Sequence, residues 1–413
     1  MIAAVAQPLG RIMLVAGEPS GDALGAKLMA ALKLRSMGLV EFVGVGGALM
    51  EAQGLKSLFP IDELSVMGLL EVLPRAPQLL ARLRETAQAV DRLRPAAVVT
   101  IDSPGFNFRL AKRIRGLGIP LIHYVAPQVW AWRPKRAKKV AKLFDHLLAL
   151  LPFEPSWFEG EGLPTTFVGH PAIEVGVIKP DGKTFRRQLG IGPDALMLLL
   201  LPGSRADEVR RHLPVFAETV RLLRLRFPDL AIVLPAVPAV AENIASVAAS
   251  WPDKPLVVQI SDRAAAFAAA NAALAASGTV TLELALAGVA TVIAYRMHPI
   301  TSWLARRLVT IPYAGLANIL MEREVMPELL LEQCRPERLA EALGKALTDH
   351  DARDRHLREA ALIAEKLGAG GEPPSLKAAD AVLRAIAIGP HKGGPRKARG
   401  DHPPNSNRLT QAR

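Results

Sequence analysis

Short apolar runs alternate with stretches of helical spacing along the first half of the chain. Apolar side chains recur at helical spacing over residues 22–34 and 77–93. The runs short enough to be strands are residues 11–16, 40–45, 96–101, 120–125 and 146–150. Strands separated by helices in this way are typical of parallel sheets in α/β proteins. The pattern therefore predicts a Rossmann-like domain.

The same alternation begins again after a turn-rich pause between residues 169 and 193. The strand-like runs of this second half are residues 196–201, 231–235, 256–259, 272–276 and 291–294. We place the domain boundary near residue 175 and predict two Rossmann-like domains, 1–175 and 176–388. Residues 389–413 lack apolar periodicity and are rich in Gly, Pro and Asn, which predicts a disordered, basic tail.

Length and composition agree with two cytoplasmic domains. The chain has 413 residues, half of them hydrophobic, which is too long for one compact core. Its single cysteine, Cys334, excludes an internal disulfide framework, and burial as a small apolar side chain is favoured over catalysis. The first residues lack the basic start of a signal peptide, and no apolar run is long enough to predict a transmembrane helix.

The charge favours an anionic partner. The formal net charge is +12, of which the last 23 residues supply five. Six basic residues and no acid lie between residues 133 and 142, directly after Trp130 and Trp132. Such an excess suits nucleic acid, anionic lipid or a phosphorylated substrate, and here it favours an anionic partner over a merely solvated face. Ordinary packing of the two tryptophans remains the alternative.

Residues 64–73 form a conspicuously apolar segment, LSVMGLLEVL, beside the basic residues Arg75, Arg82 and Arg84. An interfacial helix that touches lipid has this combination of large apolar side chains and neighbouring cations. A helix buried in the core has a similar composition. The sequence alone leaves the two readings equally open.

Asp102 is the lone acid at the end of an apolar run, where it opens a Ser-Pro-Gly turn. In an open α/β sheet, ligands bind at the carboxyl ends of the strands. A carboxylate in that position can take a proton from a substrate. The alternative is an Asx-type turn residue that only shapes its loop.

A glycine-rich turn, residues 17–25, follows the first apolar run. Glycines let backbone amides approach a ligand, and a helix N-terminus attracts anions. The spacing is not that of a dinucleotide-binding motif. Capping of the following helix by Ser20 or Asp22 is an equally good reading.

The segment Leu201-Pro-Gly-Ser-Arg205 stands between a strand-like run and a helical one. Gly203 permits close approach of the backbone, Ser204 can cap the helix, and Arg205 can bind a phosphate with two parallel hydrogen bonds. An arginine at a helix start opposes the favoured sign of the dipole, so a bound anion is credible. The alternative is an exposed arginine paired with Glu208.

Residues 276–283, ASGTVTLE, form a second strand–turn–helix segment of this kind. The Ser-Gly-Thr turn can hold phosphate oxygens, and Glu283, one helical turn further on, can accept two hydroxyl hydrogen bonds, as from a ribose. If this segment stood alone, capping by Ser277 or Thr279, with Glu283 paired to a lysine, would be the preferred explanation.

Taken together, these segments resemble the lipid-A-disaccharide synthase family, glycosyltransferases of Gram-negative outer-membrane lipid assembly. The likeness runs from about residue 11 to about residue 383. The segments that carry it are AGEPSGD (16–22), FVGVGG (42–47), VMGLLEVL (66–73), IDSPGFN (101–107), HYVAPQVWAW (123–132), FVGHP (167–171), LPGSR (201–205), SGTVTLE (277–283) and IPYAGLANIL (311–320).

The resemblance implies a GT-B fold, in which two Rossmann-like domains with parallel sheets face each other across a cleft. The donor would be UDP-2,3-diacylglucosamine and the acceptor 2,3-diacylglucosamine 1-phosphate (lipid X). The enzyme would join them by a β-1,6 bond, invert the anomeric carbon and release UDP, with neither metal ion nor cofactor. It would bind the acceptor in its first domain and UDP in its second, associate peripherally with the anionic inner membrane, and form a homodimer.

The resemblance also implies residue roles. Three residues would be catalytic. Asp102 would be the general base, Arg205 would stabilise the departing UDP, and Asn318 would match a functionally required asparagine of the family and orient a sugar or phosphate. The residues expected to bind substrate or UDP are Gly17, Glu18, Ser20, Gly203, Ser204, Ser277, Gly278, Thr279 and Glu283. Those expected to contact membrane lipid are Val66, Met67, Leu69, Leu70, Trp130, Trp132 and Arg133.

Two other functions are consistent with parts of the sequence. Another GT-B enzyme, a UDP-N-acetylglucosamine transferase or epimerase, would share the nucleotide site but would not need a lipid-facing segment. A nucleic-acid-binding protein would explain the basic stretch and tail. We expect no nucleic-acid partner, because no recognition module is visible and the charge is spread over both domains.

Overall fold

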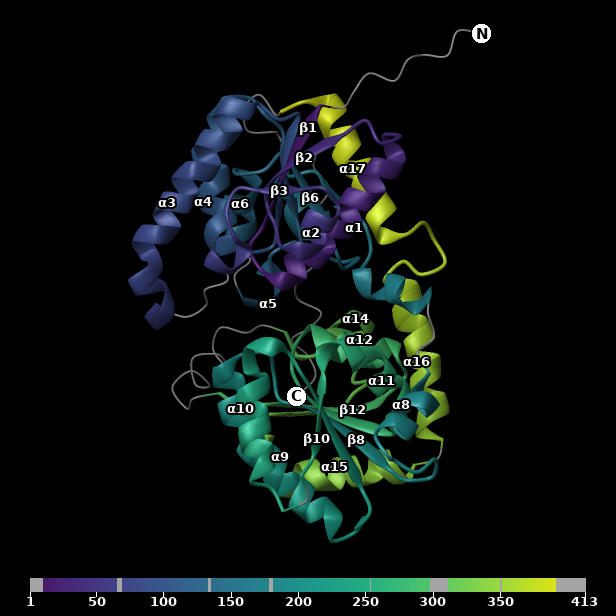
Figure 1. Ribbon diagram of the computed structural model, residues 1–413. Coiled ribbons are helices and arrows are strands. Elements are labelled where there is room, and N and C mark those ends of the chain that lie inside the picture. The colour runs from purple at the N-terminus through teal and green to yellow at the C-terminus, as the bar shows by residue number, and fades with distance from the viewer. Residues whose placement is uncertain are drawn as a thin grey trace. The chain divides into compact units, whose positions relative to one another are not determined.

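The computed structural model describes residues 10–64, 69–132, 135–177, 181–252, 254–297, 311–349 and 351–390. The chain divides into two compact units, residues 1–171 with 367–413, and residues 172–366. Each unit is a parallel sheet with helices on both faces (Figure 1). The prediction of two Rossmann-like domains is confirmed.

Seven parallel strands form the sheet in the described part of the first unit, in the order β3-β2-β1-β4-β5-β6-β7. They are β1 (Arg11–Ala16), β2 (Glu41–Val45), β3 (Lys56–Ser57), β4 (Ala97–Ile101), β5 (Leu121–Tyr124), β6 (His146–Ala149) and β7 (Thr165–Phe167). The helices are α1 (Pro19–Arg35), α2 (Ala48–Ala52), α3 (Leu69–Leu93), α4 (Pro104–Ile114), α5 (Val129–Trp132), α6 (Arg136–Ala141), α7 (Pro155–Glu159) and α17 (Pro374–Ile388), with 3-10 turns η1 (Ile61–Glu63) and η2 (Arg115–Leu117). A further 3-10 turn, η3 (Pro171–Val177), begins at the boundary and lies otherwise in the second unit.

After its first residue, Arg11, strand β1 is apolar because both of its faces are covered. Met13 and Val15 pack in the cluster that includes residues of α3 and α4. Ile12 and Leu14, which point to the other face, pack in the cluster that includes residues of α1 and α17. Strands buried on both sides have continuous rather than alternating hydrophobic sequences, which is why short apolar runs identified them.

The last described helix, α17, belongs to the first unit, whereas the sequence pattern assigned residues up to 388 to the second. Ala378, Ala381 and Val382 of α17 are fully buried and share a core cluster with α1. Arg35 at the end of α1 also pairs with Asp380 at 2.9 Å. The chain therefore returns to the first unit after residue 366, a long-range pairing that local periodicity does not report.

The sheet in the described part of the second unit has the order β10-β9-β8-β11-β12-β13. Its strands are β8 (Met197–Leu201), β9 (Ala231–Ala236), β10 (Leu256–Gln259), β11 (Ala272–Ala276), β12 (Ala290–Tyr295) and β13 (Glu328–Leu330). Its helices are α8 (Gly182–Gln188), α9 (Ala206–Arg224), α10 (Pro238–Ala249), α11 (Arg263–Ala269), α12 (Thr279–Leu286), α14 (Leu316–Met321), α15 (Pro336–Thr348) and α16 (Ala352–Lys366), with 3-10 turns η4 (Ile260–Asp262) and η5 (Leu331–Gln333).

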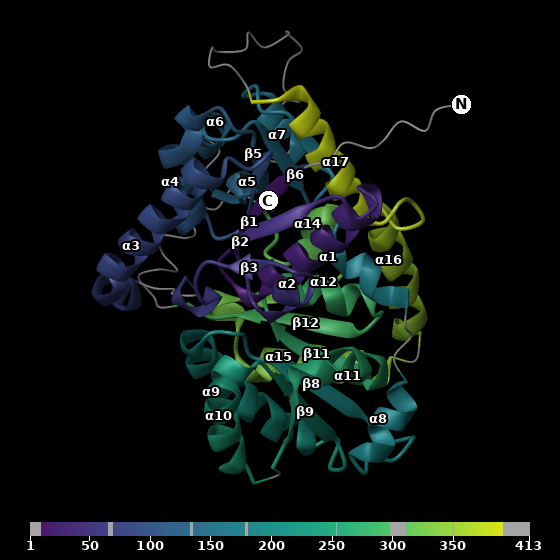
Figure 2. The same ribbon diagram turned by 45° about the horizontal axis from the view of Figure 1, so that its top comes forward.

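Figure 2 shows β9, β8, β11 and β12 side by side in the second unit. Leu198 and Leu200 of β8 pack with residues of α9 and α15 in one core cluster. Cys334 joins that cluster and is buried, as the sequence favoured, and burial raises the pKa of its thiol. Among the described helices, none is both long enough and apolar enough to cross a membrane.

Candidate functional site

Each sheet reverses its winding at one point, and the predicted motifs lie there. In the first unit the chain moves outward from β1 to β3, then returns to β4 on the other side of β1. In the second unit it moves from β8 to β10 and returns to β11 beside β8. Ligands of such folds bind at the carboxyl ends of the strands where the order reverses. The loops after β1 and β4, and those after β8 and β11, occupy these positions.

Gly17 and Ser103 bring the two loops of the first unit into contact. β1 and β4 pair in register as far as Ala16 and Ile101, so the following residues start side by side. A Cβ atom on Gly17 would overlap Ser103 Oγ, which explains the glycine at this close approach. Glu18 on this loop is half-buried and Ser20 is exposed, and neither caps α1 with its side chain.

Asp102 occupies a strained backbone position that two polar contacts hold. Its φ is +47° and that of Ser103 is +45°, a region that non-glycine residues enter at a cost of about 1–3 kcal/mol each. The Asp102 N–H donates to Tyr124 O at 2.9 Å, and the amide of buried Asn107 donates to Asp102 O at 2.8 Å. Asp102 therefore both shapes its turn and presents a half-buried carboxylate at the edge of the sheet.

Asp22 caps a helix, but not the one that contains it. Its carboxylate accepts hydrogen bonds from the N–H groups of Gly47 at 2.8 Å, Leu49 at 3.1 Å and Met50 at 3.0 Å, at the start of α2. The side chain is buried, and a Cβ atom on Gly47 would collide with it. The segments 16–22 and 42–47 thus depend on each other structurally, and Asp22 is not available to a ligand.

Trp130 contradicts its predicted role in lipid contact. Its side chain is 4% exposed, lies edge-on against Phe153, and donates from Nε1 to Glu154 Oε1 at 3.4 Å. The ring is part of the core because this hydrogen bond satisfies its one polar atom. The side chain of Trp132 and the whole of Arg133 lie outside what the structure describes.

Glu154 is a buried acid that the sequence analysis did not identify. Its Oε2 accepts from the N–H groups of Leu150 at 3.1 Å and Leu151 at 3.0 Å, directly after β6. The side chain is 3% exposed, and burial raises the pKa of its carboxyl to about 7. Glu154 ties the loop after β6 to the Trp130 segment that follows β5.

In the second unit, Glu208 holds the loop after β8. Its carboxylate accepts from the Ser204 N–H at 3.2 Å and pairs with Arg205 at 3.1 Å. Gly203 has a φ of +123°, and a Cβ atom there would collide with Glu208. Arg205 is the N-cap residue of α9, so Ser204 does not cap the helix as predicted. The Arg205 side chain is 56% exposed, so its pairing leaves it accessible to an anion.

The Ser277–Thr279 turn after β11 is held by a neighbouring loop. Ser277 Oγ donates to Ala314 O at 3.0 Å rather than capping α12. Gly278 and Thr279, at the start of α12, are exposed. Glu283 pairs with Arg263 at 3.0 Å, an arginine in place of the lysine considered above, and burial raises the pKa of the Glu283 carboxyl.

Asn318 does not have the direct role predicted for it. The side chain is fully buried and its amide is fully engaged. Nδ2 donates to Met326 O and to Glu328 Oε1, both at 2.7 Å, while Oδ1 accepts from the N–H groups of Val325 and Met326. Two donors and two acceptor positions are all that an asparagine side chain offers. Asn318 therefore acts through its neighbours, not on a ligand.

Glu328 completes this network. Its carboxylate accepts from the N–H groups of Ala314 at 2.8 Å and Gly315 at 2.9 Å, and from Asn318. Because Ala314 O accepts from Ser277, the network extends from β13 to the turn after β11. Glu328 is a further positioning residue that no local sequence signal indicated.

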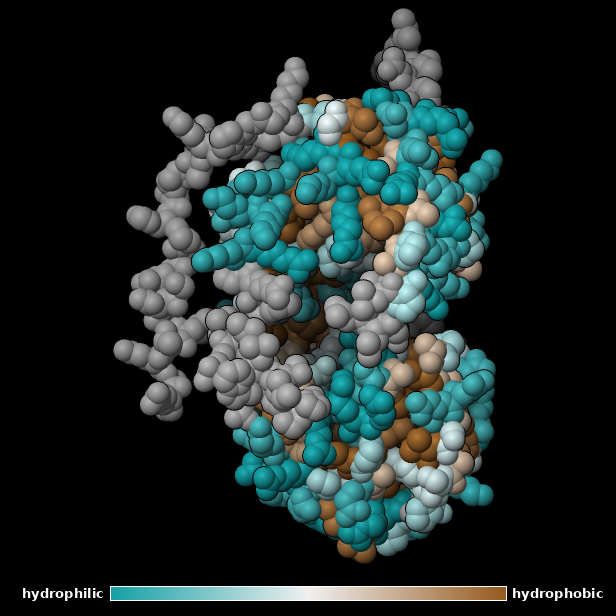
Figure 3. All heavy atoms as spheres, turned by 90° about the vertical axis from the view of Figure 1, so that its left-hand side faces the viewer, coloured by the Kyte–Doolittle hydropathy of each residue, from teal (hydrophilic) through white to brown (hydrophobic). Residues whose placement is uncertain are grey.

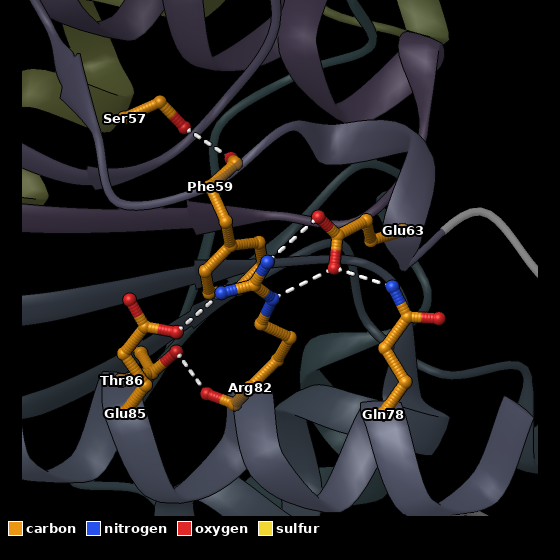
Figure 4. A network of polar contacts seen from close by, with 7 residues as sticks. All are labelled: Ser57, Phe59, Glu63, Gln78, Arg82, Glu85 and Thr86. Atoms are coloured by element: carbon orange, nitrogen blue, oxygen red, sulfur yellow. Dashed lines mark hydrogen bonds and ion pairs between the residues drawn. The ribbon is translucent and has the colours of Figure 1, made fainter.

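The predicted apolar segment lies largely outside the described residues. Val66 and Met67 fall in the gap, and Leu69 and Leu70 begin α3 with side chains that the structure does not describe. The elements before and after this apolar segment, η1 and α3, are linked to each other. Arg82 of α3 binds Glu63 of η1 through two hydrogen bonds of 2.7 and 2.8 Å (Figure 4). The hydrogen bond to Arg82 holds the pKa of the Glu63 carboxyl below its usual value.

Helices α4 and α6 of the first unit form a basic face. Residues 103–144 contain ten Lys/Arg and no Asp/Glu. α4 and α6 are adjacent, with the Arg136 guanidinium 5.3 Å from the centre of the Phe108 ring (Figures 1 and 2). The exposed cations of the two helices are Arg109, Lys112, Arg113, Lys138 and Lys139. Figure 3 shows the molecule from the side on which α3 and α4 lie in Figure 1, and hydrophilic side chains predominate there over the described residues.

Two cavities lie at the opposite, amino-terminal edges of the sheets. One, of about 550 Å³, is lined by residues that include Arg11, Glu41 and Arg94. The other, of about 320 Å³, is lined by residues that include Leu196 and Asn271. Neither contains a predicted site residue, so the geometry favours the carboxyl edges, where the motifs converge.

Comparison with known proteins identifies relatives over nearly the whole described chain. A family model described as lipid-A-disaccharide synthetase matches residues 12–372. A lipid-A-disaccharide synthase of Rhodospirillum centenum is 54% identical over 379 residues, which cover 91% of this chain and 94% of that protein.

Solved structures of the same fold are more distant in sequence. A UDP-GlcNAc 2-epimerase from Methanocaldococcus jannaschii, in complex with UDP-GlcNAc and UDP, has a TM-score of 0.59 at 13% identity and covers 92% of this chain and 100% of its own. The calicheamicin glycosyltransferase CalG4 has a TM-score of 0.54 at 19% identity, with coverages of 92% and 98%. At these identities the likeness shows the GT-B fold alone.

Glu154→Gln tests the buried acid. Because the folded pKa is raised from its usual 4.5 to about 7, the native state binds the proton more tightly than the unfolded state. The stability that Glu154 contributes is present below pH 4.5 and is lost as the pH rises to 7, by about 3 kcal/mol. Urea unfolding followed by tryptophan fluorescence should show this loss in the wild type relative to Glu154→Gln. Parallel pH profiles for the two proteins would contradict the assignment.

Proposed function

The chain belongs to the lipid-A-disaccharide synthase family, and from that premise we propose which residues carry out the reaction. The protein is a glycosyltransferase of lipid A biosynthesis that uses a UDP-sugar. We propose UDP-2,3-diacylglucosamine as donor and 2,3-diacylglucosamine 1-phosphate as acceptor. The family match favours this over an epimerase, because the epimerases share only the fold.

The placement of Asp102 carries the proposal for the acceptor side. A sugar hydroxyl is a poor nucleophile, and a positioned base contributes roughly 10²–10⁴-fold to its reaction. The Asp102 carboxylate takes the proton of the acceptor 6-hydroxyl as O6 bonds to C1 of the donor. The bond from C1 to the UDP oxygen breaks, and UDP leaves with the electron pair. Attack opposite the leaving group inverts C1.

The neighbouring loop of the first unit orients the acceptor. Gly17 lets this loop approach Ser103 closely, so Glu18 and Ser20 belong to the same edge of the sheet as Asp102. Their side-chain oxygens can accept hydrogen bonds from sugar hydroxyls. Positioning of this kind is a large part of what an enzyme gives a reaction between two bound molecules.

The second unit binds the nucleotide. Arg205 and the backbone of Gly203 and Ser204 face the diphosphate, and the start of α12 at Gly278 and Thr279 adds the positive end of a helix dipole. The exposure of Arg205, Gly278 and Thr279 supports this role. The negative charge that develops on UDP is stabilised there, as in other sites with preorganised donors.

Glu283 binds the ribose in this assignment. It lies one helical turn beyond the start of α12, and its carboxylate can accept from two hydroxyl groups. Burial raises the pKa of the Glu283 carboxyl, and the pairing with Arg263 opposes this effect by favouring the charged form, which accepts hydrogen bonds.

The basic face of α4 and α6 docks the protein on the anionic inner membrane. Both proposed substrates carry acyl chains, so the enzyme must collect them from a bilayer. The ten basic residues between positions 103 and 144, without an acid among them, support the attraction. The apolar segment with Val66, Met67, Leu69 and Leu70 would insert into the same membrane. We also propose a homodimer, which the family resemblance alone supports.

Asp102→Asn tests the base. Asparagine tolerates the left-handed backbone that residue 102 adopts, so the turn is expected to survive. Formation of disaccharide and UDP should fall roughly 10²–10⁴-fold, while UDP affinity stays unchanged. Mass spectrometry of the products measures turnover, and calorimetric titration with UDP measures the affinity. Asp91→Asn, the same change at an exposed acid of the same unit, is the control. Near-normal turnover by Asp102→Asn would remove Asp102 from the mechanism.

The double change Lys138→Glu and Lys139→Glu tests membrane docking. Each basic residue near an anionic surface contributes about 1 kcal/mol, so binding to phosphatidylglycerol vesicles should weaken roughly tenfold or more in a sedimentation assay. Arg221→Glu with Lys345→Glu, on exposed helices of the second unit, makes the same change in net charge and should bind as the wild type does. Equal pelleting of all three proteins would refute the basic face as the docking surface.

A further inference from the structure

His212 is a fully buried histidine that the proposed mechanism does not use. It lies on the second turn of α9, with 0% of its surface exposed. Its ring stacks on Phe216, with 5.8 Å between the ring centres and 17° between the planes, and lies 5.3 Å from the ring of Tyr295. A purely apolar residue would fill this space at lower cost, so its polar contacts need a reason.

Both ring nitrogens of His212 bind backbone atoms. Nδ1 lies 2.7 Å from Pro202 O, and because a carbonyl oxygen only accepts, Nδ1 must carry the proton. The Arg296 N–H donates to Nε2 at 3.1 Å, so Nε2 must be unprotonated. The partners thus fix a neutral ring in one tautomer.

These two contacts join the loops on either side of the Ser277–Thr279 turn. Pro202 begins the loop that contains Gly203, Ser204 and Arg205, directly after β8. Arg296 directly follows β12, and its side chain is exposed. β11 lies between β8 and β12 in the sheet (Figure 2). The imidazole of His212 therefore joins the loops on either side of the strand that carries the turn.

We propose that His212 is a positioning residue that sets the spacing between Arg205 and Arg296, and that Arg296 is a second cation for the diphosphate of the bound UDP-sugar. The inference rests on the proposed function, because it presumes that the second unit binds the nucleotide. His212 itself touches no substrate. It acts through the two loops that it joins.

Burial of the ring favours its neutral form. Burial lowers the pKa of His212, and the cations Arg211 and Arg296 lower it further, while the bond to Pro202 and the charge of Glu208 act in the opposite direction. Tyr295 also faces the ring, and Cys334 lies near Arg296 and Tyr295. Because the folded pKa is below the usual 6.5, the bridge is intact above pH 6.5. Acidification through the lowered pKa protonates Nε2 and removes the acceptor for Arg296.

Three substitutions separate the two contacts. His212→Phe fills the space and removes both hydrogen bonds. In His212→Asn, Nδ2 can still donate to Pro202 O, whereas in His212→Gln, Oε1 can still accept from the Arg296 N–H. Thr219→Val is the matched control, because it removes a buried hydrogen bond to Val215 O from the same helix without touching either loop.

Calorimetric titration with UDP at pH 7.5, on the full chain, provides the test. His212→Phe and Arg296→Ala should each raise the Kd for UDP roughly tenfold, as expected for the loss of one or two hydrogen bonds at a charged site. His212→Asn and His212→Gln should fall between His212→Phe and the wild type, and Thr219→Val should equal the wild type. The KM for the acceptor should not change in any of them.

Other outcomes distinguish this inference from the proposed function. Wild-type UDP affinity in His212→Phe overturns the positioning role. If His212→Phe does not fold, wild-type affinity in both His212→Asn and His212→Gln overturns it instead. Wild-type affinity in Arg296→Ala overturns the second cation. In both cases the proposed function stands if Arg205→Ala still loses UDP. If the wild type itself does not bind UDP, the nucleotide site of the second unit is wrong.

Discussion

The reversal of winding at the centre of each sheet is the constraint on which the rest of the structure depends. Where β1 meets β4 and β8 meets β11, the connecting helices leave in opposite directions, so the carboxyl ends of these strands are not covered by a crossover. Loops from distant parts of the sequence therefore start side by side. Gly17 and Ser103 show how close they come. The roles proposed for Asp102, Arg205 and the Ser277–Thr279 turn follow from their positions in these four loops.

Buried and half-buried polar side chains hold the loops in place. Asn107 binds the backbone beneath Asp102, Glu208 binds the loop of Arg205, Glu328 binds the loop beside Ser277, and His212 joins two loops across a strand. A buried polar group without partners would be costly, so these contacts specify one loop conformation each. Preorganisation of this kind is what a site needs if it is to stabilise charge that appears only during the reaction.

Sequence patterns predicted what depends on local periodicity or on a motif at a strand end. The apolar runs located most of the described strands but not the short β3, β7 and β13. Asp102, Arg205 and Ser277–Thr279 lie at the carboxyl edges as expected. Three features that depend on distant contacts were missed or misassigned. Trp130 is in the core because Glu154 satisfies its indole, Asn318 is saturated by backbone and Glu328, and α17 packs on α1 although more than 300 residues separate them. His212 gave no signal, because its partners lie on two loops, 10 and 84 residues away.

The proposed reaction depends on nucleotide binding at the carboxyl edge of the second sheet. Hydrogen exchange with and without UDP measures this binding loop by loop. We expect slower exchange with UDP in residues 202–205, 277–283 and around 296. Slower exchange centred instead on residues 193–196, beside the cavity at the amino-terminal edge, or confined to the first unit, would contradict it.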